Sequence, residues 1–160
     1  MELIKEIMDG KPDKHTRTRE SSRALLFDEE GNVPLLFGSR YNFYQLPGGG
    51  IKGGETRVEA LVREMREEVG CEIEISGEIG KIIEYKSREN VKHTSYFYLG
   101  KVVSKGKPCY TKDEKEMGFS VVWVSIGEAI SVIENDTSTH YDARFRKERD
   151  LAILKAFQKE

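Results

Sequence analysis

The chain has 160 residues and a formal net charge of −2, because 28 acidic residues nearly balance 26 basic ones. This length is typical of a domain that can bury roughly two-thirds of its unfolded surface, and the charge excludes a global basic field that would recruit nucleic acid or an anionic membrane. No apolar run approaches the roughly 18 residues of a membrane span, and the N-terminus lacks the apolar core of a secretory signal.

No linker, repeat or low-complexity run interrupts the chain, which predicts a single domain over residues 1–160. The first 20 residues are rich in charge and lie outside the core pattern. We expect them to form an extension that could add a strand to a neighbouring subunit, so a homodimer stays open.

The first predicted strands are residues 21–28 and 33–39, joined by a turn at 29–32. A glycine loop at residues 48–50 follows Pro47. Glycine can take backbone conformations closed to other residues and can approach a ligand closely. The loop is therefore a candidate binding element.

A helix is predicted over about residues 56–69. Thr56 and Glu59 form a capping-box pattern at its start, and Gly70 is a good stop signal. We expect its apolar side to anchor it in the core through Val58, Val62, Met65 and Val69.

The other side of this helix carries acidic residues at spacings i, i+3 and i+4, namely Glu64, Glu67 and Glu68. Like charges so close together repel. A divalent ion would turn this repulsion into a binding site, because Mg²⁺ prefers hard oxygen ligands. Mixed charges on a helix are typical of a solvated face, but the preceding glycine loop favours a metal site.

Residues 71–86 alternate apolar and polar side chains, and the interruptions at Gly77 and Gly80 predict a bent or bulged strand. A long strand is predicted at about 92–104. Its two faces are expected to carry Tyr96 and Tyr98 on one side and Phe97 and Leu99 on the other.

Residues 119–124 form a further predicted strand, and Ser125 with Glu128 caps a short helix that reaches about Ile133. Residues 141–158 are typical of an amphipathic terminal helix, whose apolar side carries Leu151, Leu154 and Phe157. This order of elements predicts the α/β class, with a mixed sheet between helices. Two cysteines, Cys71 and Cys109, make no disulfide framework, so we expect reduced thiols and a cytoplasmic location.

The segment from Gly49 to Cys71 resembles the Nudix box in full: Gly49, five residues, Glu55, seven residues, then a block that starts at Arg63. Met65 and Cys71 fill the positions where the box asks for a bulky apolar residue, Cys71 being the less usual choice. A chance match of the seven fixed residues is on the order of one in ten million. The resemblance implies the α/β/α sandwich of the Nudix fold, similar to MutT-like hydrolases.

Nudix proteins typically hydrolyse a diphosphate bond in a nucleoside diphosphate linked to another group. The resemblance implies Mg²⁺ or Mn²⁺ as cofactor, because divalent ions polarise phosphoryl oxygens and lower the pKa of bound water. By this resemblance Glu67 and Glu68 ligate the metal, and Glu64 either ligates it or accepts the proton of the attacking water. The main-chain carbonyl of Gly48 would supply another ligand.

The resemblance also implies supporting groups around the metal. Arg63 and Glu55 are expected to orient the carboxylates. A distal acidic ligand is expected from the loop at 111–116, with Glu116 preferred over Glu114. The alternating charges of this loop could equally keep it soluble.

Substrate-binding candidates stand just before the glycine loop. Arg40, Tyr41, Phe43 and Tyr44 could hold a base by stacking or phosphate by charge, or could pack in the core. Arg23 could reach the phosphates or face solvent.

His93 and His140 are candidates for proton transfer, because imidazole titrates near neutrality, although each also fits an ordinary partly exposed histidine. Signatures of relatives that act on coenzyme A, ADP-ribose or diadenosine polyphosphates are missing. This favours a pyrophosphohydrolase of nucleoside triphosphates or oxidised nucleotides, whose partner is a small nucleotide and neither membrane nor nucleic acid. The alternatives are a non-catalytic nucleotide sensor and an RNA 5′-end pyrophosphohydrolase, which the scattered Lys and Arg disfavour.

Overall fold

The computed structural model describes residues 1–12 and 16–159. The strands are β1 (Leu3–Met8), β2 (Arg17–Phe27), β3 (Val33–Gly38), β4 (Phe43–Gln45), β5 (Gly48–Gly50), β6 (Cys71–Lys86), β7 (Val91–Lys105) and β8 (Phe119–Val124). The helices are α1 (Arg57–Glu64), the π-helical turn η1 (Met65–Val69), α2 (Lys112–Glu116), α3 (Ile126–Glu134) and α4 (Tyr141–Gln158). None of the helices in these ranges is both long and apolar enough to cross a bilayer.

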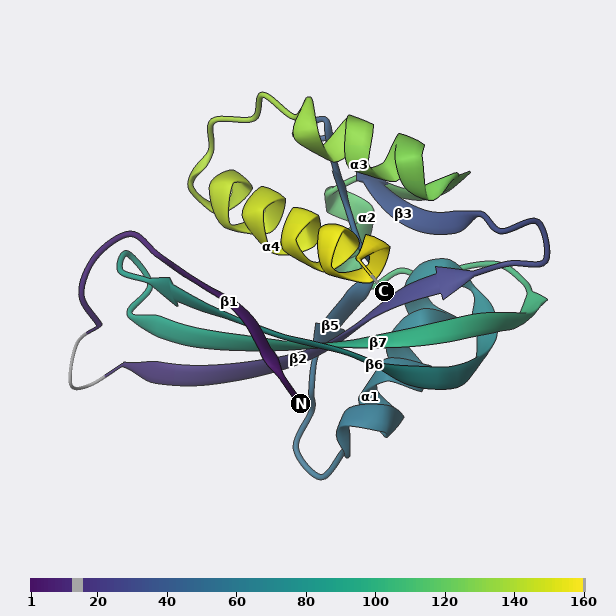
Figure 1. Cartoon of the computed structure of the whole chain (residues 1–160), viewed down its shortest axis with the longest axis horizontal. Helices are drawn as coiled ribbons and strands as arrows, with labels where there is room; N and C mark the ends of the chain where they lie inside the picture. The colour runs from purple at the N-terminus through teal and green to yellow at the C-terminus, as the bar shows by residue number, and fades with distance from the viewer. Residues whose placement is uncertain (13–15, 160) are drawn as a thin grey trace.

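The strands form a larger sheet of order β1-β6-β7-β2-β5 and a smaller sheet of order β4-β3-β8. The larger sheet is mixed, because β6 and β7 are antiparallel while β2 and β7 are parallel. In Figure 1, α1 with η1 lies below this sheet, and α4 with α3 beside it lies above. The predicted α/β class with a mixed sheet between helices is confirmed, with the sheet split in two.

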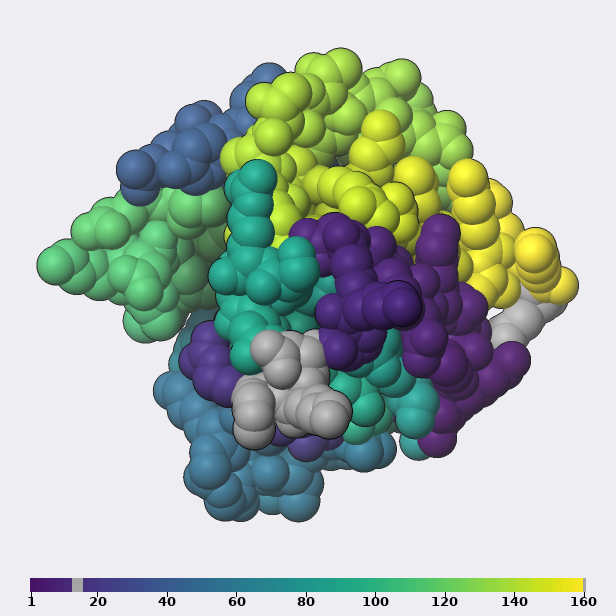
Figure 2. All heavy atoms as spheres, turned by 90° about the vertical axis from the view of Figure 1, so that its left-hand side faces the viewer, coloured from purple at the N-terminus to yellow at the C-terminus, as the bar shows by residue number. Residues whose placement is uncertain are grey.

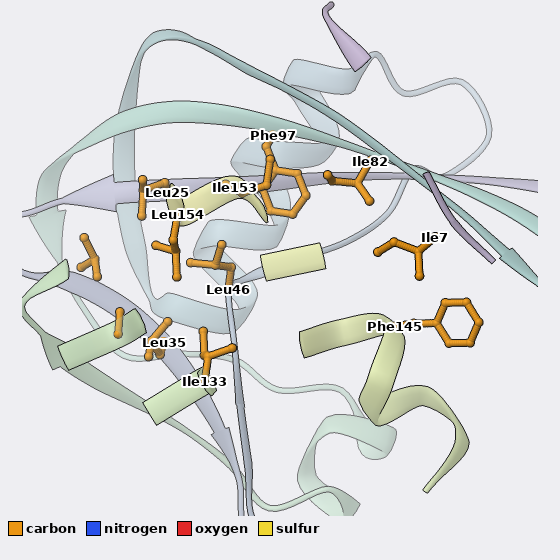
Figure 3. Packing of buried hydrophobic residues seen from close by; sticks show 12 residues of the cluster. Ile7, Leu25, Leu35, Leu46, Ile82, Phe97, Ile133, Phe145, Ile153 and Leu154 are labelled. Atoms are coloured by element: carbon orange, nitrogen blue, oxygen red, sulfur yellow. The ribbon is translucent and has the colours of Figure 1, made fainter. Parts of the chain in front are cut away.

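Strand β7 separates two apolar cores, as its alternation predicts. Tyr96 and Tyr98 pack with Leu61 and Met65 of the α1 layer. Phe97 packs on the opposite face with residues of α4, in the larger cluster that we call the main core, and Figure 3 shows this core between the sheet and the helix. The burial of both faces places β7 and its neighbour β2 at the centre of the molecule.

Strand β6 is bent at the predicted positions. Its register against β7 shifts between Ile75 and Gly77 and again between Glu78 and Gly80. These irregularities curl the long hairpin around the core.

The expectation that the first 20 residues lie outside the core is wrong. Strand β1 pairs in parallel with β6 of its own chain, and Ile7 is only 2% exposed within the main core. Strand β2 also begins at Arg17 rather than at residue 21, because residues 17–20 pair with the start of β7. A strand of this segment therefore completes its own sheet.

The box helix begins and ends as predicted, but its buried side differs. Thr56 and Glu59 form both bonds of the capping box, and Gly70 ends the helix at φ 77°. The prediction that Val58 anchors the helix is wrong, because the first turn lies in solvent and Val58 is 44% exposed. Met65 and Val69 are buried as predicted, and Leu61, which the pattern did not single out, is fully buried as well.

Candidate active site

Three carboxylates from two distant parts of the chain meet beside the glycine strand. Oxygen atoms of Glu64, Glu68 and Glu114 lie within 4.8 Å of one another, and we call these residues the acidic cluster. Glu64 and Glu68 are only 7% and 3% exposed. Burial raises the pKa of both carboxyls, and the charge of Glu64 raises that of Glu68 further.

This cluster fits a divalent cation. Buried carboxylates that share a site repel one another, and a cation between them removes both the repulsion and the cost of burial. The donors are all hard oxygens, which Mg²⁺ and Mn²⁺ prefer. The residues present therefore match the cofactor implied by the sequence.

Glu67 lies at the rim of this cluster rather than within it. Its side chain is 27% exposed, and its Oε2 is 3.4 Å from Nη1 of Arg63. The π-helical turn η1 begins directly after Glu64, so the spacing of the three box carboxylates is not that of a regular α-helix. The structure thus brings together Glu64 and Glu68 and leaves Glu67 beside them.

Arg63 ties the box helix to the loop before it. Its Nε and Nη2 donate to the two oxygens of Glu55 at 2.7 and 2.9 Å. Its Nη1 donates to Glu64 Oε1 at 3.0 Å, and its Nη2 also donates to the carbonyl of Gly50 at 3.0 Å. The hydrogen bonds from Arg63 lower the pKa of Glu55 to about 2. The predicted Arg63–Glu55 pair is therefore formed, and it fixes one carboxylate of the cluster.

The glycine strand β5 approaches the cluster so closely that only glycine fits at position 49. The Gly48 N–H donates to Glu68 Oε1 at 2.7 Å, and the Gly48 carbonyl accepts from Arg23 Nη1 at 3.4 Å. A Cβ on Gly49 would lie 2.4 Å from Glu64 Oε1. Gly48 and Gly49 thus set the positions of the Glu68 and Glu64 carboxylates.

Gly49→Ala is expected to fold but to bind metal poorly. The added methyl would displace the Glu64 carboxylate from Arg63. We expect Mn²⁺ affinity, measured by calorimetry, to fall about 10- to 100-fold. Gly53→Ala is the matched control, because a Cβ there meets nothing within 4 Å. Equal Mn²⁺ affinity in the two variants would contradict the prediction.

The distal acidic residue of the cluster comes from α2. Glu114 reaches the cluster, whereas Glu116 at the end of the same helix is exposed and lies outside it. The Cys109 N–H donates to the Glu67 carbonyl at 2.7 Å, which ties this segment to the end of the box helix. Glu114 also closes a capping box with Thr111, a local signal that marks the start of α2 but not which of its side chains faces the cluster.

Tyr110 is a neighbour that the sequence did not single out. Its hydroxyl is buried without a hydrogen-bond partner among the described residues. Burial raises its pKa, and the charges of Glu68 and Glu114 add to this effect. Only the fold brings this hydroxyl near the cluster, so no sequence signal marks it.

The family of the chain follows from a direct match. Residues 17–146 match the model of the NUDIX domain, which is most of the chain. The chain belongs to the Nudix family. The match begins with β2 and ends within α4, so it contains the acidic cluster, whereas Ile7, Ile153 and Leu154 of the core beneath α4 lie outside it.

Individual Nudix relatives share parts of the chain. The RNA pyrophosphohydrolase of Helicobacter pylori is 45% identical over 58 residues, which are 36% of this chain and 37% of that protein. Diphosphoinositol polyphosphate phosphohydrolase 2 of Mus musculus is 28% identical over 114 residues, 71% of this chain and 60% of that protein. The chain thus spans less than two thirds of the length of either relative.

A solved structure confirms the Nudix fold. The MutT protein from Methanosarcina mazei is 25% identical, with a TM-score of 0.63 over 92% of this chain and 100% of that one. The predicted α/β/α arrangement is therefore that of known Nudix structures.

The substrate-binding candidates of this Nudix chain fall into different environments. Arg40 and Tyr41 lie in the turn between β3 and β4, and Tyr41 is 44% exposed with its ring 4.9 Å from that of His140. Backbone hydrogen bonds join this turn to residues 117–118, and Figure 2 shows the two loops side by side on one face. Tyr44 packs on Phe37, with ring centroids 4.8 Å apart.

Arg23 does not face solvent. It is 8% exposed, and its guanidinium donates to Ser95 Oγ at 3.2 Å as well as to the Gly48 carbonyl. Burial lowers its pKa to about 10. Arg23 therefore supports the glycine strand from the neighbouring strand β2.

The histidines differ in burial. His93 is buried in the larger sheet, where its Nε2 hydrogen-bonds Ser21 Oγ at 2.7 Å. Burial, together with nearby cations of which Arg23 acts most strongly, lowers the pKa of His93 to about 2. This histidine is therefore neutral near physiological pH. His140 is partly buried at the N-cap of α4, beside Tyr41.

His93→Gln is expected to flatten the acid side of the stability profile. Below pH 6.5 the unfolded histidine takes up a proton that the buried one does not, so wild-type stability falls as pH falls. In the variant, the slope of the unfolding free energy against pH should be smaller by up to about 1.4 kcal/mol per pH unit. Denaturant unfolding at several pH values measures it. An unchanged slope would show that His93 titrates normally.

Proposed function

We propose that the chain is a cytoplasmic, divalent-metal-dependent hydrolase of a phosphoanhydride bond in a nucleoside diphosphate linked to another group. The observation that carries the proposal is the buried acidic cluster of Glu64, Glu68 and Glu114. The family membership supports the metal dependence, and the named activities of the two relatives support the class of bond.

Each residue of the site has a role in this proposal. Glu68, Glu64 and Glu114 would hold Mg²⁺ or Mn²⁺, with Glu67 and the Gly48 carbonyl as further candidates. When bound, a divalent ion neutralises phosphoryl oxygens and makes water a better nucleophile. Glu64 would add a ligand oxygen or accept the proton of the attacking water. Arg63 keeps the Glu64 carboxylate in place through its charge-assisted bond.

The substrate that we favour is a nucleoside triphosphate or an oxidised nucleotide. The turn offers the cation of Arg40, which lies 5.2 Å from the centre of the half-exposed Tyr41 ring, as a contact for such a molecule. An RNA 5′ end is the second candidate, favoured by the 45% identity to an RNA pyrophosphohydrolase over 58 residues.

A substrate panel tests the proposal. Canonical and oxidised nucleoside triphosphates, nucleotide sugars, dinucleoside polyphosphates, 5′-triphosphate RNA and a diphosphoinositol polyphosphate are incubated with Mg²⁺ or Mn²⁺. We expect phosphate or pyrophosphate release that a chelator abolishes. Preference for RNA, with strongly salt-dependent binding, would favour the second candidate. Nucleotide binding without any product over hours would identify a sensor and overturn the proposal.

Glu114→Gln and Glu116→Gln distinguish the two candidates for the distal ligand. Glu114→Gln removes one of three converging carboxylates, so the Mg²⁺ concentration for half-maximal rate should rise about 10- to 100-fold. Glu116→Gln alters an exposed side chain on the same helix and should leave turnover and metal dependence unaltered. The opposite result in steady-state kinetics would place the distal ligand at Glu116.

A further inference from the structure

Helix α4 carries charged side chains on its buried side. Arg149 is 4% exposed and Asp150 is fully buried, although both belong to a helix whose apolar residues fill the main core. Burying an ion pair costs desolvation energy, and apolar residues of similar size often stabilise a core better. Stability of the core therefore does not explain this pair.

The ion pair of Arg149 and Asp150 contacts the backbone just before the glycine strand β5. Asp150 Oδ2 accepts a hydrogen bond from the Leu46 N–H at 2.9 Å. Arg149 Nε and Nη2 donate to the Asp150 carboxylate at 2.7 and 3.2 Å, which holds both its oxygens in place. Leu46 is itself fully buried. Asp150 thus anchors a backbone position two residues ahead of Gly48.

Strand β2 holds the same segment from its other side. The Pro47 carbonyl accepts from the Ala24 N–H at 3.1 Å, and the Gly48 carbonyl accepts from Arg23. Residues 46–48 are therefore clamped between α4 and β2. The next contact along the chain is the Gly48 N–H to Glu68 Oε1 at 2.7 Å, so the clamp ends at the acidic cluster.

Arg149 does not pair equally with its two acidic neighbours, Glu84 and Asp150. Its Oε1 is buried without a hydrogen-bond partner among the described residues and lies 3.8 Å from Arg149 Nη1. Arg149 instead directs its close donors to Asp150. The Asp150 carboxylate is therefore held by two hydrogen bonds, whereas Glu84 Oε1 is left without one.

We propose that Asp150, held by Arg149, is a positioning residue of the active site. It fixes the segment from Leu46 to Gly48, so that Gly48 keeps its hydrogen bond to Glu68 and the acidic cluster keeps the geometry that a divalent ion needs. The link to catalysis rests on the proposed function, whereas the anchoring itself does not.

Two double variants test the anchor without leaving either member of the Arg149–Asp150 pair as a lone buried charge. Arg149→Leu/Asp150→Leu removes the ion pair and the acceptor of the Leu46 N–H. Arg149→Leu/Asp150→Asn removes the same ion pair but retains a carbonyl oxygen as acceptor. The two proteins therefore differ at one side chain, and the difference isolates the bond to Leu46.

The readouts are Mn²⁺ affinity by calorimetry without substrate, and hydrogen exchange of the Gly48 amide without metal. We expect the Leu/Leu variant to lose Mn²⁺ affinity about 10- to 100-fold and to exchange the Gly48 amide faster. The Leu/Asn variant should stay near the wild-type values in both. Equal values in the two double variants would overturn the proposal.

Asp150→Glu provides a second test if the Leu/Leu variant does not fold. It keeps the charge opposite Arg149 and displaces the carboxylate by one methylene, so weaker Mn²⁺ binding is expected and wild-type binding would overturn the proposal. Wild-type protein that binds Mn²⁺ but hydrolyses nothing would refute the proposed function alone. An active wild type with unaffected variants would refute the positioning role alone.

Discussion

Glu68→Gln is expected to lower kcat by about 10²–10³-fold while the protein still folds. Glu68 is the most buried carboxylate of the acidic cluster and lies between the Gly48 N–H and the other two members. Glutamine keeps the shape and can still accept from Gly48, but it lacks the charge that a cation needs. Steady-state kinetics with saturating Mg²⁺ measure the loss.

Thermal unfolding separates this loss from damage to the fold. Burial raises the pKa of Glu68, so the charged form destabilises the metal-free protein and its removal should leave the unfolding temperature unchanged or higher. Mn²⁺ should raise the unfolding temperature of the wild type, because it binds the folded state, and should have little effect on the variant. Full activity in Glu68→Gln would contradict a metal role for this residue.

Comparing the kcat of Glu67→Gln with that of Glu68→Gln tests whether Glu67 is also a metal ligand. The sequence places Glu67 beside Glu68 as a first choice of ligand, and the structure places it at the rim with Arg63. A loss as large as that of Glu68→Gln would show that Glu67 joins the cluster when metal binds.

Gly48→Ala is expected to have the largest effect on stability. Gly48 has a φ of 148°, and a Cβ there would lie 2.5 Å from the Ser22 carbonyl and 2.6 Å from Arg23 Cα. These are backbone atoms of β2, and they cannot move away from the added methyl group unless β5 separates from the sheet. We expect the free energy of unfolding to fall by about 3 kcal/mol. This corresponds to a melting temperature lower by about 6–12 °C.

Gly54→Ala is the control for this variant. Gly54 also has a positive φ, 84°, but a Cβ there meets nothing within 4 Å. Its free energy of unfolding should fall by only about 1 kcal/mol, which is the cost of placing alanine at a positive φ. Calorimetric unfolding of both variants measures the difference, and equal losses would show that backbone strain rather than the close approach to β2 sets the cost.

Much of the fold could be predicted because its signals are local. The capping boxes at Thr56 and Ser125 join groups three residues apart, and both form. The alternation of β7 assigns Phe97 and Tyr98 to opposite cores, as observed. The pairing of Arg63 with Glu55 also crosses only eight residues. Such features depend on backbone geometry that a few neighbouring residues set.

The tertiary structure alone decided which charged groups meet. Glu114 and Glu116 lie two residues apart on one short helix, and only the tertiary structure brings Glu114 rather than Glu116 to the cluster. The apolar spacing of α4 predicts a helix but not that Arg149 and Asp150 lie in the interior, since their burial depends on partners about a hundred residues away. The amino-acid sequence by itself determined the family, the caps and the strand faces, because these follow from short-range spacing. The distal carboxylate, the fully buried Leu61 and the anchor at Leu46 depend on long-range packing, which local spacing does not encode.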